Sequence, residues 1–361
     1  MSVNRRDFLR IGTGGAVAAS LALESLPAQV PESSVSTETR RIDFHSHAFL
    51  AELLRSLGKY YPEIIHYKED PVRGPYAIHA GTPLPAWDDS LRIKDIQAAG
   101  VDVEVLSCPP LYTALDDHLP ELCRLVNDRL AGSCLRYPRR FKAFAHLPFN
   151  DMDALLKEMS RCLDQLGFVG VFITSNIGGH YLDAPQFEEF WHEADKRRVP
   201  VFLHPLLSPC YQDSEQPPIF SFPYESTLAV TRLITRGLYE RFPNVVLVVA
   251  HLGGTLPYLA HRIDLGHEIP ALRTPEWKIS RPPSEYMKKL YFDTAMGWSR
   301  GAFNCARDLV GIEHLVLGTD YFIRESGWMG RTTGFLSSLD IKPAERELIS
   351  YQNASRILKL S

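Results

Sequence analysis

The sequence predicts a (β/α)8 TIM barrel, an α/β fold, over residues 41–361. Short apolar, β-branched runs alternate with amphipathic helical patterns, which is typical of parallel βα units. Several of these runs end in, or are followed within two residues by, a histidine or an aspartate, as expected at the active-site mouth of a barrel. An open doubly wound sheet is the alternative, but no Gly-x-Gly-x-x-Gly motif follows the first run. The runs number eight: 41–45, 101–107, 141–147, 168–174, 199–204, 245–250, 290–294 and 314–318.

Composition narrows the class of protein before any motif is considered. The chain has 361 residues, of which 45% are hydrophobic and 23% charged. That apolar content excludes a disordered protein, and the length accommodates a barrel with insertions. The formal net charge is −4, so there is no basic excess and nucleic acid is not an expected partner.

Residues 1–28 have the layout of a twin-arginine signal peptide. Arg5 and Arg6 precede Phe8 and Leu9, and a short stretch rich in glycine and alanine follows. That stretch is too short to span a bilayer, and no other run is long enough, so no membrane span is expected in the mature protein. Residues 29–40 form a polar linker. We therefore expect export through the twin-arginine pathway, to the periplasm.

The segments between the predicted strands are helical or are insertions. Amphipathic patterns predict helices over 151–166, 184–198 and 227–242. Residues 48–95, after the first strand, are too many for a simple connection. Their tyrosines and Trp87 indicate an ordered lid or a pocket wall. Irregular insertions are also expected at 205–223, after the fifth strand, and at about 266–285, before the seventh.

The first strand carries an His-x-His pattern. Alternate residues of a strand share a face, so Asp43, His45 and His47 are expected to point one way. Ile42 and Phe44 would then point toward the covering helices. Two imidazoles two residues apart lie about 7 Å apart along the strand, a spacing that suits two ligands of one metal ion.

Three further strands end in a side chain that can bind metal or move a proton. His204 ends the fifth strand, His251 follows the sixth and Asp320 follows the eighth. In a barrel these ends meet at one mouth. His146, after the third strand, and Asp293, on the seventh, are secondary candidates; Asp293 would join the site or orient His251.

Imidazoles together with a carboxylate favour a divalent metal ion. The expected cofactor is one ion, Zn²⁺ first and Mn²⁺ as the alternative, with an open position for water or substrate. Such an ion lowers the pKa of a bound water to about 7. A nearby histidine outside the ligand set can then transfer protons near neutral pH.

These residues lie within a longer pattern that resembles the amidohydrolase superfamily, and specifically its aminocarboxymuconate-semialdehyde decarboxylase branch. The resemblance spans about residues 41–358 and includes these blocks: Asp43-x-His45-x-His47, Ala99-Gly100-Val101-Asp102, Tyr137-Pro138-Arg139-Arg140-Phe141, His204-Pro205, Arg241-Phe242-Pro243, Ala250-His251-x-Gly253-Gly254, Leu317-Gly318-Thr319-Asp320-Tyr321 and Asn353-Ala354.

The resemblance implies a role for each site residue. It implies that a single metal is held by four ligands and that His251 is the proton-transfer histidine outside that set. Asp320 would be both ligand and catalytic residue. The fourth strand, 170–174, lacks the lysine that bridges two metals in other relatives, which favours a mononuclear site. The four implied ligands are His45, His47, His204 and Asp320.

Three functions fit this site. The first is a metal-dependent decarboxylase, a carbon–carbon lyase acting on a small unsaturated or aromatic carboxylic acid through a metal-bound water and His251. The second is a hydrolase or hydratase that attacks a lactone, an amide or a C=C bond with the same residues. The third is an exported barrel that binds a ligand without catalysis. The expected partner is a small-molecule carboxylate, and a homodimer is one assembly to test.

Overall fold

The computed structural model describes residues 40–72, 74–79, 82–109, 116–206, 218–295, 297–322 and 327–360. The predicted signal peptide, 1–28, lies outside these residues, as do linker residues 29–39. Most of the predicted insertion at 205–223 also lies outside them, because residues 207–217 are not described. A compact unit runs from Thr37 to Ser361.

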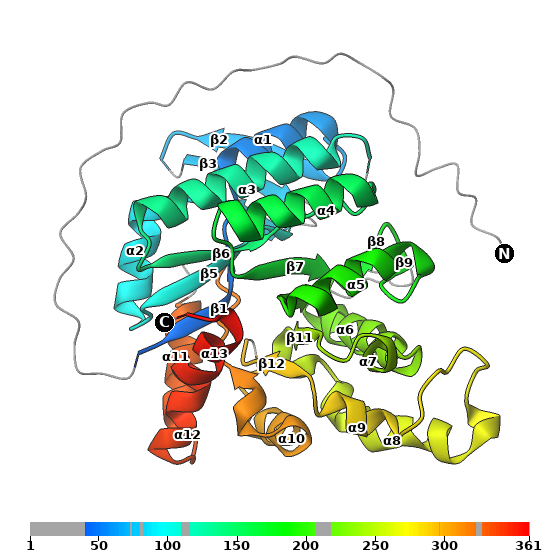
Figure 1. Ribbon diagram of the computed structural model, residues 1–361. Helices are drawn as coiled ribbons and strands as arrows, with labels where there is room; N and C mark the ends of the chain where they lie inside the picture. The colour runs from blue at the N-terminus through cyan, green and yellow to red at the C-terminus, as the bar shows by residue number, and fades with distance from the viewer. Residues whose placement is uncertain are drawn as a thin grey trace. The chain divides into compact units, whose positions relative to one another are not determined.

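The described chain forms an eight-stranded parallel sheet with helices outside it (Figure 1). Neighbouring strands follow chain order around the sheet, which is the topology of a barrel. Each strand coincides with one of the eight predicted runs, so the predicted fold is confirmed. The strands are β1 (Ile42–His47), β5 (Val103–Ser107), β6 (Phe141–Ala145), β7 (Gly170–Thr174), β10 (Pro200–His204), β11 (Val246–Val249), β12 (Tyr291–Asp293) and β13 (Leu315–Val316).

Backbone hydrogen bonds join the last strand to the first. The N–H of Phe44 donates to the carbonyl of Leu317 over 2.8 Å, and the N–H of Asp320 donates to the carbonyl of His45 over 2.8 Å. A parallel bridge joins Ser46 to Tyr321. The chain beyond β13 therefore closes the barrel against β1.

Helices cover the strands, and several begin at side-chain caps. Asp88, Asp151 and Ser299 each accept a hydrogen bond from the backbone N–H three residues later, which satisfies a donor of the first helical turn. The helices over 151–166, 184–198 and 227–242 are confirmed, each interrupted or extended by a turn. The α-helices that follow residue 86 are α2 (Asp89–Ala98), α3 (Leu119–Arg136), α4 (Met152–Ser160), α5 (Glu188–Arg197), α6 (Pro218–Thr235), α7 (Leu238–Arg241), α8 (Leu256–Glu268), α9 (Pro283–Met287), α10 (Arg300–Val310), α11 (Trp328–Ser338), α12 (Pro343–Glu347) and α13 (Asn353–Leu358).

The insertion after β1 is ordered, as its aromatic content predicted. It contains α1 (Ala51–Tyr60) and a three-stranded antiparallel sheet. The strands of that sheet are β2 (Ile65–Asp70), β3 (Gly74–His79) and β4 (Thr82–Pro85). The N–H of Trp87 donates to the carbonyl of Phe49 over 2.8 Å, so the insertion returns to the barrel mouth beside the end of β1.

The expected facing of β1 is wrong at Phe44. Its ring lies 5.2 Å from that of Phe144 on β6 and 5.5 Å from that of Phe202 on β10, measured between ring centroids. Strand β10 is not a neighbour of β1 in the sheet, so Phe44 points into the barrel interior. The reason is a bulge in β1.

The bulge is visible in the pairing of β1 with β5. Asp43 pairs with Glu104 and Ser46 pairs with Leu106, so β1 takes three steps where β5 takes two. A bulge interrupts the strict alternation of faces and re-aims side chains. Phe44, His45 and His47 thus all face inward, whereas Asp43 does not share their face.

Among the described residues, no helix is both long and apolar enough to cross a membrane.

Candidate metal centre

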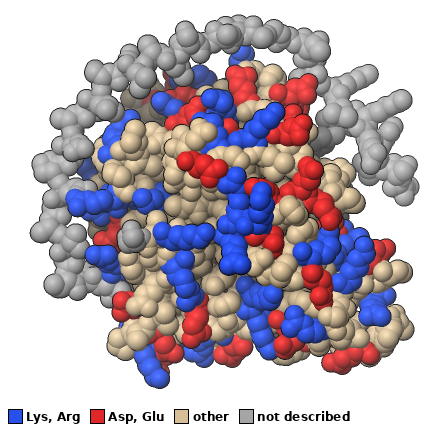
Figure 2. Space-filling view, viewed as in Figure 1, with Lys and Arg blue, Asp and Glu red and all other residues tan. Residues whose placement is uncertain are grey.

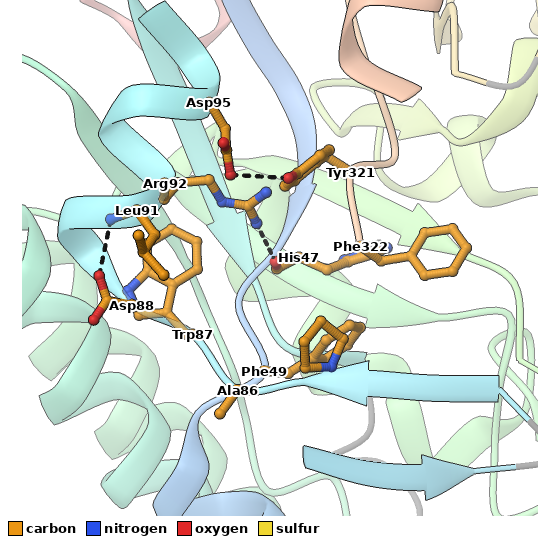
Figure 3. A pocket seen from close by; sticks show the side chains of 11 residues that line it. His47, Phe49, Ala86, Trp87, Asp88, Leu91, Arg92, Asp95, Tyr321 and Phe322 are labelled. Carbon is orange, nitrogen blue, oxygen red and sulfur yellow. Dashed lines mark hydrogen bonds between the residues drawn. The ribbon is translucent and has the colours of Figure 1, made fainter. Parts of the chain in front are cut away.

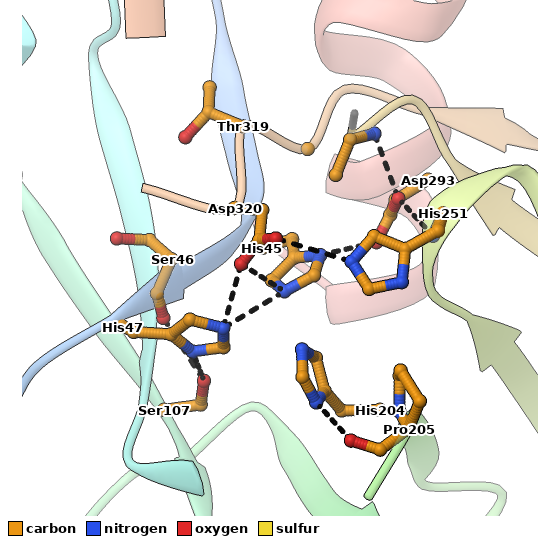
Figure 4. A network of polar contacts seen from close by, with 12 residues as sticks. His45, Ser46, His47, Ser107, His204, Pro205, His251, Asp293, Thr319 and Asp320 are labelled. Atoms are coloured by element: carbon orange, nitrogen blue, oxygen red, sulfur yellow. Dashed lines mark hydrogen bonds and ion pairs between the residues drawn. The ribbon is translucent and has the colours of Figure 1, made fainter. Parts of the chain in front are cut away.

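Four of the predicted site residues converge at the carboxyl ends of the strands (Figure 4). His45 and His47 come from β1, His204 ends β10 and Asp320 follows β13. Each offers one ligand atom, and these atoms all lie within 4.8 Å of one another. All four side chains are buried. The residues come from opposite sides of the barrel, which only closure of the sheet brings together.

The hydrogen bonds of the three histidines turn the same ring nitrogen toward the centre. Nδ1 of His45 lies 2.8 Å from Oδ2 of Asp293, and Nδ1 of His204 lies 2.8 Å from the carbonyl oxygen of Pro205. Both partners only accept, so each Nδ1 carries the proton. In both rings Nε2 is then the nitrogen directed at the cluster.

The third histidine follows the same rule through a hydroxyl. Nδ1 of His47 lies 2.9 Å from Oγ of Ser107, and that hydroxyl donates to the carbonyl oxygen of Ser46 over 3.0 Å. Because its proton is used there, Oγ accepts from Nδ1 of His47. Partners of this kind fix the tautomer and the ring orientation of metal-binding histidines.

Asp320 supplies the carboxylate of the cluster. Its Oδ1 lies 2.9 Å from Nε2 of His47 and 3.2 Å from Nε2 of His45. Burial by itself would raise the pKa of Asp320, but the charge of His45 and the hydrogen bonds from neighbouring imidazoles hold it well below its usual range. The group is therefore an anionic donor at neutral pH.

The donor set fits a divalent cation. Burial lowers the pKa of His47 to about 4 and that of His204 well below its usual range, so both rings are neutral, as metal ligands must be. Burial also acts to lower the pKa of His45, but Asp320 and Asp293 outweigh it and raise that pKa to about 10. Without an ion the His45 ring therefore carries a proton between two carboxylates, and a bound cation would take the place of that positive charge. Three imidazole nitrogens and one carboxylate oxygen suit Zn²⁺ or Mn²⁺.

His251 lies beside this donor set. Its Nε2 is 3.2 Å from Oδ2 of Asp320, the carboxylate oxygen that does not face His45 and His47. Its Nδ1 is buried and has no hydrogen-bond partner among the described residues. The backbone of His251 is left-handed, with φ 59°, and its N–H donates to Oδ1 of Asp293 over 2.9 Å. The ring nitrogen of His251 that faces the donor set is therefore Nε2.

Asp293 and His146, the two secondary candidates from the sequence, have different surroundings in the structure. Asp293 orients both His45 and His251 and so lies directly behind the cluster. His146 instead uses both ring nitrogens within the protein. Its Nε2 accepts from the N–H of Cys108 over 2.8 Å, and its Nδ1 lies 3.1 Å from the carbonyl oxygen of Phe144. Burial lowers the pKa of His146 to about 3, so it is a neutral core residue.

Sequence reasoning missed Ser107, which orients His47. The available signal was the same as for the other site residues, since Ser107 is a polar residue at the end of an apolar strand. It also missed the bond from Arg92, whose guanidinium donates to the carbonyl oxygen of His47 over 2.5 Å. No local pattern in the sequence distinguishes Arg92 from the other polar residues of α2.

A pocket opens beside His47 and is walled partly by the insertion after β1 (Figure 3). Phe49, Trp87 and Phe322 line it with aromatic rings, and Pro85 belongs to β4 of the insertion. The predicted role of this insertion as a pocket wall is confirmed. An aromatic-lined pocket next to a metal-binding residue suits a small planar substrate.

Residues 42–360 match a protein-family model described as amidohydrolase. The chain belongs to the amidohydrolase family. This amidohydrolase is 33% identical over 291 residues to gamma-resorcylate decarboxylase from Rhizobium radiobacter, a match that covers 74% of this chain and 86% of the relative. It is 30% identical over 243 residues to 2-amino-3-carboxymuconate-6-semialdehyde decarboxylase from Dictyostelium discoideum, covering 65% of this chain and 67% of the relative.

A solved structure extends the likeness to three dimensions. The dihydroxybenzoic acid decarboxylase of Polaromonas sp. JS666 superimposes on this amidohydrolase with a TM-score of 0.73 at 25% identity. The match covers 90% of this chain and 98% of that one. That structure holds manganese and the inhibitor 2-nitroresorcinol. The family resemblance and the barrel predicted from the sequence are confirmed.

Proposed function

We propose that this amidohydrolase is a metal-dependent decarboxylase of a small aromatic carboxylic acid. One observation carries the proposal: an ordered donor set of three imidazoles and one carboxylate lies beside a further histidine, His251, whose Nε2 is 3.2 Å from Asp320. The aromatic-lined pocket next to His47 supports a planar ring as substrate. The names of the relatives support the same class of reaction.

The proposed ligands are His45, His47, His204 and Asp320. A divalent ion bound there would neutralise the substrate's negative charge and polarise its oxygens. Because three of the ligands are already oriented by Asp293, Ser107 and the carbonyl of Pro205, little rearrangement is needed on binding. Zn²⁺ remains the ion expected from the donors, and manganese in the Polaromonas structure supports Mn²⁺ as the alternative.

His251 is the proposed proton-transfer residue. Decarboxylation breaks the bond between the ring carbon and the carboxylate, leaves the electron pair on that carbon and releases CO₂. One proton must then reach the carbon. His251 can supply it, since its Nε2 lies at the donor set, 3.2 Å from Oδ2 of Asp320. Asp293 holds the backbone of His251 in place during the transfer.

The assay that tests the reaction measures CO₂ release against hydrolysis with the same protein. Purified protein, loaded with Zn²⁺ or with Mn²⁺, is incubated with 2,6-dihydroxybenzoate and a panel of hydroxybenzoates and unsaturated acids, and separately with lactone and amide substrates. We expect CO₂ release from at least one aromatic acid. Hydrolysis of a lactone without CO₂ release from any acid would favour the hydrolase alternative.

We also propose that the protein is exported by the twin-arginine pathway to the periplasm. The support is the Arg5-Arg6 pair followed by a short apolar stretch. Fractionation of cells that express the full chain should find it outside the cytoplasm, and replacing both arginines by lysine should retain it inside. Equal distribution of the two proteins would contradict the proposal.

The proposed assembly is a homodimer formed through α6 and α8. The two helices are linked by a 2.9 Å hydrogen bond between the hydroxyls of Thr227 and Thr255. Large apolar side chains on and just beyond them are exposed, and exposed apolar surface is a feature of interaction sites. The exposed residues are Ile219, Phe220, Tyr224, Leu228, Tyr258, Leu265, Ile269 and Leu272. Light scattering should find a dimer, and Tyr258→Glu should yield monomer; a monomeric native protein would overturn this.

A further inference from the structure

Asp43 lies below the metal centre and touches neither the pocket nor the ligand atoms. Its side chain is fully buried. Every hydrogen bond that its carboxylate makes in the described structure comes from a residue next to a proposed metal ligand or from a ligand's own backbone. This placement gives Asp43 a function that the sequence pattern alone did not indicate.

One oxygen of Asp43 accepts hydrogen bonds from β1 and from the segment that follows β13. Oδ1 accepts from the N–H of His45 over 3.1 Å and from the N–H of Thr319 over 2.9 Å. The first of these donors lies inside the β1 bulge, where the pairing with β5 is interrupted. A bulge leaves backbone groups without ladder partners, and a buried donor without a partner is costly. The carboxylate therefore stabilises the bulge that turns His45 inward.

The second oxygen holds the residue before Asp320. Oδ2 accepts from the hydroxyl of Thr319 over 2.5 Å. The next residue, Asp320, has a left-handed backbone with φ 54°, which costs roughly 1–3 kcal/mol outside glycine and persists only when the surroundings hold it. Two contacts hold it here: the bonds from Thr319 to Asp43, and the bond from the N–H of Asp320 to the carbonyl of His45 over 2.8 Å.

We propose that Asp43 is the positioning residue that couples the two sides of the metal centre. Through one carboxylate it places the His45 backbone in the bulge and the Asp320 backbone in its left-handed turn. These two ligands are far apart in sequence, on the first strand and after the last, and Asp43 joins them at the seam where the barrel closes. The inference rests on the proposed metal ligands.

The test measures metal affinity by competition with a chelator, without any substrate. Asp43→Ala is compared with Asp102→Ala, a matched control. The carboxylate of Asp102 also accepts a backbone N–H next to β1, that of Arg41 over 2.8 Å, but at the end of the strand away from the metal centre. We expect Asp43→Ala to weaken Zn²⁺ binding roughly 10- to 100-fold, the usual cost of removing such a supporting group, and Asp102→Ala to leave it unchanged.

A second pair of variants keeps the test decisive if Asp43→Ala does not fold. Thr319→Val removes the hydroxyl that Asp43 binds, and Thr319→Ser keeps it. We expect weaker Zn²⁺ binding only for Thr319→Val, together with an altered visible absorption spectrum of the Co²⁺-loaded protein, which reports the ligand geometry. Native affinity and spectrum in both Asp43→Ala and Thr319→Val, or in Thr319→Val alone if the other is unfolded, would overturn the proposal. If the unmodified protein bound neither Zn²⁺ nor Co²⁺, the proposed function itself would fail instead.

Discussion

Oδ2 of Asp293 accepts a 2.8 Å hydrogen bond from Nδ1 of His45, and Oδ1 of the same carboxylate accepts from the N–H of His251. One side chain thus sets both the tautomer of a proposed metal ligand and the backbone of the proposed proton-transfer histidine. Asp293 ends β12, which lies in the sheet between β11 and β13. His251 follows β11 and Asp320 follows β13.

Asp293→Asn should weaken metal binding. An amide NH₂ facing Nδ1 of His45 would favour the opposite tautomer and put a proton on Nε2, the ligand atom. We expect roughly 10- to 100-fold weaker Zn²⁺ affinity, measured by chelator competition. The control is Asp102→Asn, which alters a carboxylate remote from the site. Unchanged affinity in Asp293→Asn would mean that His45 binds no metal through Nε2.

His251→Asn should separate metal binding from turnover. The ring of His251 contacts Asp320 but offers no ligand atom to the four-residue cluster. We expect metal content near one equivalent and a fall in kcat of roughly 10²- to 10⁴-fold, the range for loss of a general acid or base. Elemental analysis and CO₂ release measure the two quantities. Near-native kcat would contradict the proton-transfer role.

His204→Ala and Asp320→Ala should lose metal and activity together. Each removes one of the four ligand atoms that gather within 4.8 Å. Metal bound only to the folded state stabilises it, so chelation should lower the Tm of the native protein. In the two variants we expect little or no change of Tm on adding a chelator. A chelator-induced shift as large as in the native protein would show that the ion binds elsewhere.

The metal-free protein should lose stability in acid, in part through His146. Burial lowers the pKa of this group from 6.5 to about 3, so the folded state excludes a proton that the unfolded chain binds below pH 6.5. The free energy of unfolding therefore falls as pH drops from about 6.5 toward 3, by up to about 1.4 kcal/mol per pH unit for this residue. Urea titrations between pH 6 and pH 4 should show a smaller slope for His146→Asn, by about that amount.

Phe44→Ala should destabilise the barrel itself. The Phe44 ring is fully buried against Phe144 and Phe202, so its removal leaves a cavity in the interior. We expect a loss of about 3–5 kcal/mol in the free energy of unfolding, measured with urea. Leu135→Ala, at a side chain that is 81% exposed, is the control and should change stability little. An equally small change for Phe44→Ala would place the ring outside the core.

Charge alone does not reveal the site, because the surface carries both signs. Figure 2 shows Lys and Arg interspersed with Asp and Glu across the visible face. Several of these groups pair, as Arg197 does with Asp164 at 2.9 Å on the outer helices. Exposed pairs of this kind contribute little to stability. The informative charges are instead the buried ones at the strand ends.

The amino-acid sequence was enough to predict the eight strands, their order and the polar residues at or just after their ends. This was possible because the alternation of strands and helices is local, and because a histidine or aspartate after an apolar run is unusual enough to notice. His45, His204 and Asp320 could all be named in this way. Trp87 and its neighbours likewise indicated an ordered wall.

The directions of those side chains depend on contacts between distant parts of the chain and could not be predicted from the sequence. The bulge in β1 depends on its pairing with β5 and on hydrogen bonds from Asp43 to the far end of the chain, so strict alternation mispredicted Phe44. The tautomers of the three histidines depend on Asp293, Ser107 and the carbonyl of Pro205. Asp293 and Ser107 come from other strands, whereas Pro205 follows His204 directly in the sequence. The physical reason is that hydrogen bonds across a closed barrel join residues that have no fixed spacing in the sequence.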